Sequence, residues 1–212
     1  NSNVTHKFKP NSDGLWVLDE TNGTETVPGG VITGGTGYLY KDNNITIESG
    51  GGVYVASGGT LDMTGGSIVG CSAVRGGGVF VLSGTFNMTG GSIVGCVAGQ
   101  GGGVYMWKTN AVFSMSENAV VRCCKTVSNN ASGGGVYALG KFTMSGNAAI
   151  RNCECSSNSG SAMGGGVFVS YHDKTTEFTM SDCAVIENCK VTAASPKSWI
   201  DSYGGGVYVS SG

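Results

Sequence analysis

Short stretches of alternating apolar and polar residues run through most of this chain. Val53-Tyr54-Val55 and Phe86-Asn87-Met88 each place apolar side chains two residues apart, and Gly and Ser residues separate such stretches. A period of two predicts β-strands with one buried face, and stretches of about three or four residues are too short for helices. The pattern therefore predicts an all-β protein built from many short strands.

These stretches belong to an internal repeat. A unit of three Gly, one Val and one aromatic residue begins at six positions, which are Gly50, Gly76, Gly101, Gly133, Gly164 and Gly204. The copies lie 26, 25, 32, 31 and 40 residues apart, and a second and a third apolar stretch follow each of the first five. Three strands per repeat predict a solenoid with three faces, in which each repeat covers the next.

Aligned copies place like residues in columns. One predicted inward column holds Leu61, Phe86, Phe113, Phe142 and Phe178, and a second holds Met63, Met88, Met115, Met144 and Met180. Equivalent positions of stacked parallel strands lie ~4.8 Å apart, so each column buries its own side chains. Because connections between parallel strands are right-handed, the sequence predicts a right-handed parallel β-helix of about five to six coils.

The repeat also divides the chain. Residues 1–37 lack the unit and carry Trp16 and Leu18, so they are predicted to form an N-terminal cap and entry coil, with the repeats in 38–212. The sequence stops just after Val209-Ser210, in the middle of a coil. We expect the array to continue in a longer parent protein, or another chain to cover this edge by self-association, because bare strand edges invite pairing.

Composition and charge argue against several classes of protein. With 39 Gly but only 3 Pro, the chain fits neither collagen nor a Pro-rich linker. Its net charge is −2 and its 12 basic residues are scattered, which argues against nucleic acid as a partner. No stretch approaches the ~18 apolar residues of a membrane helix, so we expect no membrane insertion.

Eight cysteines and five glycosylation sequons are compatible with a secreted chain. The sequons begin at Asn3, Asn22, Asn44, Asn87 and Asn130. There is no Cys-x-x-Cys, and the two histidines, His6 and His172, lie outside any zinc-like spacing. The sequence therefore predicts no metal site and no cofactor.

Alignment on the Met column predicts how the cysteines pair. Cys71, Cys96 and Cys123 fall in one column, Cys124, Cys153 and Cys189 fall one residue later, and Cys155 and Cys183 fall outside both. Neighbouring coils bring such pairs into disulfide range, and Cys71 with Cys96 is the best pair. The other connectivities stay open, and a core of buried free thiols is the alternative.

Two features are candidate binding surfaces. The span between each Cys and the next triple Gly grows toward the C-terminus, which predicts long edge loops, above all Ser195–Tyr203 with Trp199. The aromatic residue of each unit is predicted to point outward and to form an exposed ladder that stacks on sugar rings or only supports neighbouring strands. The candidate residues are Trp199, Tyr203, Tyr105, Tyr137, Phe168 and Tyr208.

The acidic residues do not gather as glycan hydrolysis requires, so the sequence favours a protein without catalysis. The richest patch holds His172, Asp173, Glu177, Asp182 and Glu187. Within it Glu187 falls in the column of Arg122 and Arg151, which indicates a neutralising charge ladder. The alternatives are a polysaccharide-degrading lyase or glycosidase that uses Asp173, Glu177 or Glu187, and a structural spacer or filament subunit.

The repeat resembles a known kind of surface protein. Gly-Gly-Gly-Val-Tyr-Val, followed by a stretch such as Gly84 to Cys96, is similar to the repeats of adhesin-like, right-handed β-helix surface proteins of host-associated microbes. It also resembles the chlamydial polymorphic membrane proteins, whose Gly-Gly-Ala-Ile and Phe-x-x-Asn motifs occupy comparable places. Residues 50–212 carry the resemblance. It implies an extracellular or cell-surface module that binds a glycan or an extracellular protein.

Overall fold

The computed structural model describes residues 4–42, 45–171, 175–193 and 202–210. In this part of the chain the regular structure consists of thirty short β-strands and no helix, which confirms the all-β prediction. Accordingly, none of the described segments is a helix of the length and hydropathy that a membrane span needs.

Each repeat contains at least four strands, where three were expected. The first full repeat runs through β7 (Val53–Val55), β8 (Thr60–Met63), β9 (Ser67–Val69) and β10 (Ser72–Arg75). The fourth strand lies in the span after the Cys that was predicted to be a loop. It escapes the hydrophobic pattern because its side chains are small or polar apart from Val74, which is half exposed.

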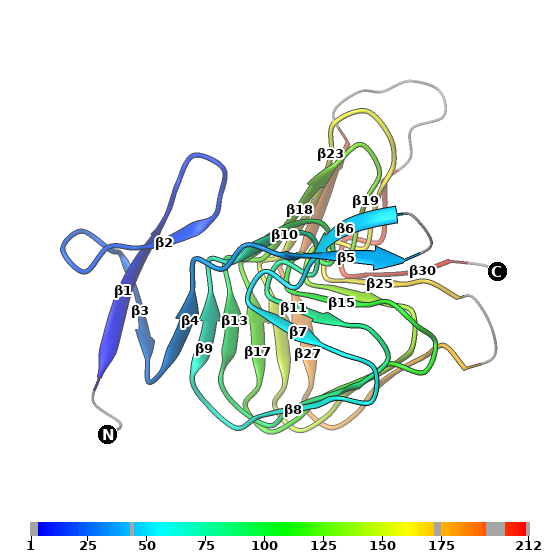
Figure 1. Ribbon diagram of the computed structural model, residues 1–212, viewed down its shortest axis with the longest axis horizontal. Coiled ribbons are helices and arrows are strands. Elements are labelled where there is room, and N and C mark those ends of the chain that lie inside the picture. The colour runs from blue at the N-terminus through cyan, green and yellow to red at the C-terminus, as the bar shows by residue number, and fades with distance from the viewer. Residues whose placement is uncertain (1–3, 43–44, 172–174, 194–201, 211–212) are drawn as a thin grey trace.

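Each strand pairs in parallel with its equivalent in the next repeat, which produces four sheets (Figure 1). Sheet I contains β7, β11 (Val79–Val81), β15 (Val104–Met106), β20 (Val136–Ala138), β25 (Val167–Val169) and β30 (Val207–Val209). Sheet II contains β8, β12 (Thr85–Met88), β16 (Val112–Met115), β21 (Lys141–Met144) and β26 (Glu177–Met180). These separate parallel sheets are compatible with a parallel β-helix.

The other two sheets complete the repeats. Sheet III contains β4 (Val31–Thr33), β9, β13 (Ser92–Val94), β17 (Val120–Arg122), β22 (Ala149–Arg151) and β27 (Val185–Glu187). Sheet IV contains β5 (Tyr38–Asp42), β6 (Ile45–Ser49), β10, β14 (Val97–Gln100), β18 (Lys125–Ser128), β23 (Glu154–Ser157) and β28 (Lys190–Ala193). Beside them in sheet IV lie β19 (Ala131–Ser132), β24 (Ala162–Met163) and β29 (Ser202–Tyr203). Only the β5–β6 hairpin is antiparallel in this sheet.

The core consists of the predicted inward columns. Phe86, Phe113 and Phe142 are fully buried, and their rings stack with centroids 4.7 and 4.9 Å apart. The pairing places Met88 opposite Met63 and Met115, so the Met column is confirmed as well. Offset stacking of aromatic rings adds to the free energy of burying them, which favours this register over its neighbours.

The predicted cysteine columns need one correction. Between the Met strand and the next strand, the chain has one residue more after Met115 than after Met88, as the pairs Met88–Met115 and Ser92–Val120 show. The inward column is therefore Cys71, Cys96, Cys124, Cys153 and Cys189. Cys123 instead takes the preceding turn position, with φ near 54°, where Gly70 and Gly95 stand in earlier repeats.

A small antiparallel sheet precedes the array and lies beside β4 in Figure 1. It consists of β1 (Thr5–Pro10), β2 (Trp16–Leu18) and β3 (Glu25–Pro28), with β1 in the middle. Phe8, Trp16 and Val27 bury their side chains against Val69 and Val94 on the outer face of sheet III. This N-terminal sheet thus covers a side of the array, where a terminal cap was expected.

Candidate functional site

The aromatic column stacks as predicted, but three of its six rings are buried. Ring centroids from Tyr54 to Tyr208 lie 4.4 to 5.7 Å apart along the column. However, Phe80, Tyr105 and Phe168 keep only 0 %, 4 % and 6 % of their surface, and burial raises the pKa of the Tyr105 hydroxyl. The stacked column therefore supports the strands, and its partly exposed rings are those of Tyr54, Tyr137 and Tyr208.

The triple Gly explains this burial. Tyr203, directly before Gly204, stacks on Tyr208 at 5.3 Å, and the guanidinium of Arg75, directly before Gly76, lies 5.6 Å from the Tyr105 ring centroid. The first Gly of each unit has a positive φ, near 64° at Gly76, which favours Gly. The turn folds the end of sheet IV toward the aromatic face of sheet I, and the rings lie in the inner corner.

Several predicted residues lie outside the described part of the chain, namely Trp199, Asn3, Asn44, His172 and Asp173. Tyr203 is 43 % exposed. Of the remaining sequons, Asn22 and Asn130 are exposed, whereas Asn87 is partly buried and its amide donates a hydrogen bond to Asp62 at 2.8 Å.

The two candidate carboxylates that the structure describes, Glu177 and Glu187, lie on different sheets, and each is paired. Glu177 on sheet II lies 3.2 Å from the Lys141 amine, and Glu187 on sheet III lies 3.0 Å from Nε of Arg151. The predicted column of Arg122, Arg151 and Glu187 is confirmed by the strand register. Across the described residues, no three His, Cys, Asp or Glu side chains gather as a metal site.

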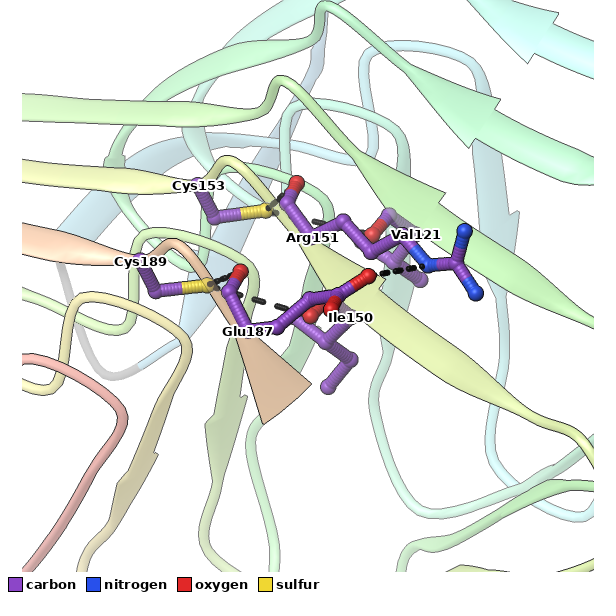
Figure 2. A network of polar contacts seen from close by, with 6 residues as sticks. All are labelled: Val121, Ile150, Arg151, Cys153, Glu187 and Cys189. Atoms are coloured by element: carbon purple, nitrogen blue, oxygen red, sulfur yellow. Dashed lines mark hydrogen bonds and ion pairs between the residues drawn. The ribbon is translucent and has the colours of Figure 1, made fainter. Parts of the chain in front are cut away.

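All eight cysteines are free thiols, so the predicted disulfides are absent. In the inward column each Sγ donates to the carbonyl two residues before it at 3.3–3.6 Å. It also lies 3.8–4.0 Å from a carbonyl of the preceding repeat, as Figure 2 shows for Cys153 and Cys189. In-register parallel strands hold such side chains ~4.8 Å apart, wider than the ~3.8 Å between the Cβ atoms of a disulfide.

The described surface also has a groove of about 520 Å³ on the outer face of sheet III, beside the N-terminal sheet. We call it the arginine groove. Its lining consists of Pro28, Gly65, Gly66, Ser67, Gly91, Ser92, Asn118, Val120, Arg122 and Arg151. These residues come from successive repeats, so the groove crosses β9, β13, β17 and β22. The sequence did not reveal it, because one wall depends on how residues 5–28 dock.

Two arginines supply the charged side chains of this groove. Arg122 donates from Nη1 to Glu25 at 3.4 Å, and its guanidinium lies 5.3 Å from the Trp16 ring. Arg151 contacts Glu187 through Nε, and its two terminal nitrogens point away from that carboxylate (Figure 2). The partner carboxylates do not line the groove. Its walls therefore carry two guanidinium groups without an acidic side chain between them.

Smaller polar groups complete the site. The hydroxyls of Ser67 and Ser92 hydrogen-bond to each other at 2.8 Å, and the Asn118 amide oxygen accepts from Asn147 at 3.4 Å. Gly65, Gly66 and Gly91 also line this side, and a Cβ added at Gly65 would meet no atom within 4 Å. The arrangement suits an extended polar ligand that carries negative charge.

A second hollow of about 420 Å³ lies at the N-terminal end of the core, where sheets I and II begin with β7 and β8. Ile32, Val53, Leu61 and Met63 make it largely apolar.

Comparison with known proteins gave no match: no family model, no curated protein and no solved structure corresponds to this chain.

Proposed function

We propose that this chain is a rigid, extracellular binding module of a cell-surface protein and that it has no catalytic activity. The arginine groove is the observation that carries the proposal. It presents fixed donors from four successive strands of sheet III, and its charged side chains have partners outside the groove that hold them in place. Such prepositioned groups favour recognition.

The architecture that we propose is a right-handed parallel β-helix of the adhesin-like kind. In-register parallel pairing in every repeat supports it, and so does the resemblance of residues 50–212 to surface proteins of host-associated microbes. A stack of this kind is stiff, because each strand bonds to both neighbours and the inward columns fill the core. Stiffness suits a module that displays a binding surface away from a cell.

The partner that we propose is a glycan or an extracellular protein, bound in the arginine groove and not on the aromatic column. The burial of Phe80, Tyr105 and Phe168 in that column favours this choice. Glu177 and Glu187, two of the carboxylates that an enzyme would use, are engaged in ion pairs on separate sheets, which favours binding over hydrolysis.

The test is an array of glycans and matrix proteins probed with the purified chain, with retained protein and released sugar fragments both measured. We expect retention on one ligand class, its loss in Arg151→Ala and its persistence in Lys141→Ala. The control removes a cation of similar exposure from sheet II. Released fragments would overturn the proposal in favour of an enzyme. Absence of retention, with end-to-end assembly in sedimentation, would favour a filament subunit.

A further inference from the structure

We infer that the arginine groove binds a linear acidic glycan that carries an acid group on each successive sugar. This inference rests on the proposed binding function and names its ligand class. Arg122 on β17 is paired directly with Arg151 on the adjacent strand β22, so the two side chains lie next to each other in one column. Paired residues of adjacent parallel strands lie ~4.8 Å apart, which is close to the rise of one sugar unit in an extended chain.

The positive charges of the groove favour a ligand that carries acid groups. The two guanidinium groups line the groove, and their carboxylate partners, Glu25 and Glu187, do not. Guanidinium groups bind carboxylates and sulfates through paired, charge-assisted hydrogen bonds. The terminal nitrogens of Arg151 have no hydrogen bond with any described residue and are directed away from Glu187 (Figure 2). They are therefore free to hold a ligand acid without breaking the existing ion pair.

The remaining lining selects a sugar chain over a compact anion. From Arg122 and Arg151 the lining continues along the first residues of β17, β13 and β9, which are Val120, Ser92 and Ser67. The hydroxyl and amide groups along it are suited to sugar hydroxyls, and the open space at Gly65 allows a pyranose ring to approach the backbone. With one sugar for each of the four strands crossed, the groove holds about four units.

The two arginines differ in how they are held. Arg122 packs over Trp16 and bonds to Glu25 of β3, so its removal also affects the docking of the N-terminal sheet. Arg151 has 46 % of its side chain exposed, and among the described residues its side chain forms an ion pair with Glu187 alone. Arg151 is therefore the position to test, because its substitution leaves the fold intact.

The experiment is calorimetric titration of the full chain with three probes of equal length. An oligogalacturonate has one acid on every sugar, a hyaluronan oligomer has one on every second sugar, and a cello-oligosaccharide has none. We expect the oligogalacturonate to bind most tightly, with an affinity that falls as salt is added. Arg151→Ala should weaken oligogalacturonate binding about tenfold. Arg151→Lys should keep only part of the affinity, because lysine lacks the forked pair of donors of a guanidinium group.

One variant separates binding from structure. Glu187→Gln removes a negative charge beside Arg151 that repels a ligand acid, so it should tighten oligogalacturonate binding about threefold. Lys141→Ala is the matched control and should change nothing. Equal binding of all three probes, or no effect of either change at 151 and 187, would overturn this inference. If these probes do not bind but an array ligand is lost in Arg151→Ala, the inference fails and the proposed function stands. If nothing binds, both fail.

Discussion

The parallel array and the N-terminal sheet are stabilised in different ways. In the array each strand lies on a copy of itself, so that Phe stacks on Phe and each inward thiol meets the same two kinds of carbonyl. The N-terminal sheet has no such copies. It is held by one small cluster around Phe8, Trp16 and Val27 and by a hydrogen bond from the Trp16 amide to the Gly95 carbonyl.

This difference shows how a repeat protein acquires a specific site. Identical repeats alone give columns of like residues, and charges within them pair along the column, as Lys125, Glu154 and Lys190 do at 3.5–3.6 Å. The arginine groove arises where the irregular sheet meets the regular one. Arg122 belongs to the array, but its partners Glu25 and Trp16 belong to the N-terminal sheet.

The largest predicted effect concerns the Phe column. Phe113→Ala removes a fully buried ring between two stacked neighbours, so we expect a loss of about 3–5 kcal/mol in the free energy of unfolding. Because adjacent repeats stabilise each other, the whole array should unfold earlier in urea. Phe113→Leu is the control and should cost clearly less. A change below ~1 kcal/mol for Phe113→Ala would contradict the central role of this column.

The next effect separates the two regions. Gly95 has φ near 58°, and a Cβ there would lie 2.1 Å from the Trp16 ring. We therefore expect Gly95→Ala to undock the N-terminal sheet at a cost of about 2–3 kcal/mol while the array stays folded. Hydrogen exchange should rise in residues 5–28 and not in sheets I and II.

Gly58→Ala is the matched control for this prediction. Gly58 also has a positive φ, near 71°, but a Cβ there would meet no atom within 4 Å. It should show only the strain of the left-handed backbone, about 1–2 kcal/mol, and the N-terminal sheet should stay docked. Equal hydrogen-exchange profiles for the two variants would mean that the docking of Trp16 does not depend on the space next to Gly95.

The same difference explains what the sequence could predict. The Phe and Met columns follow from like residues at like places in the repeat, and the structure confirms them. One additional residue between β16 and β17 is enough to misplace Cys123 by one position in an alignment on Met115. The outward direction of the aromatic column was predictable, but its burial was not, because the angle of the triple-Gly turn is a property of the backbone.

The arginine groove could not be predicted for a related reason. Gly70 and Gly95 appear in the sequence as ordinary turn residues of the repeat, yet they also provide the space that Trp16 occupies. Arg122 and Arg151 were recognised as neighbours in a column, whereas the wall at Pro28 depends on docking between distant segments. Contacts between unlike segments leave no periodic signal.

The adjacent residues Cys123 and Cys124 report separately on the N-terminal sheet and on the array core, with a smaller expected effect than the substitutions above. Cys124 is 1 % exposed in the array core, and burial raises the pKa of its thiol well above the usual value. Cys123 is half-buried beside the Trp16 cluster. In the native protein we expect iodoacetamide to modify the exposed Cys183 first and Cys124 last, at pH 7 and at pH 9 alike.

Gly95→Ala should change only one of these two cysteines. Undocking of the N-terminal sheet exposes Cys123, so its modification should accelerate on the order of tenfold while Cys124 stays protected. Mass spectrometry of peptides resolves the two sites. Parallel acceleration at both positions would show that the N-terminal sheet and the array open together, and the comparison between them would lose its basis.

The smallest effect concerns the charges that hold the N-terminal sheet together. The hydrogen bond with Lys9, followed by the bond from the Asn22 amide, lowers the pKa of Asp19 from 3.8 to about 2. Because the folded-state pKa is the lower one, this stabilisation is complete above pH ~4 and is lost as the pH falls toward 2. Salt screens such exposed pairs, so the effect should be small.

Between pH 4 and 2 we expect hydrogen exchange to increase in residues 5–28 before it increases in the array, and Asp19→Asn should remove that early step. If the variant keeps the same acid transition, another group on the sheet controls it, and His6 with Glu20, 2.8 Å apart, is the next pair to change.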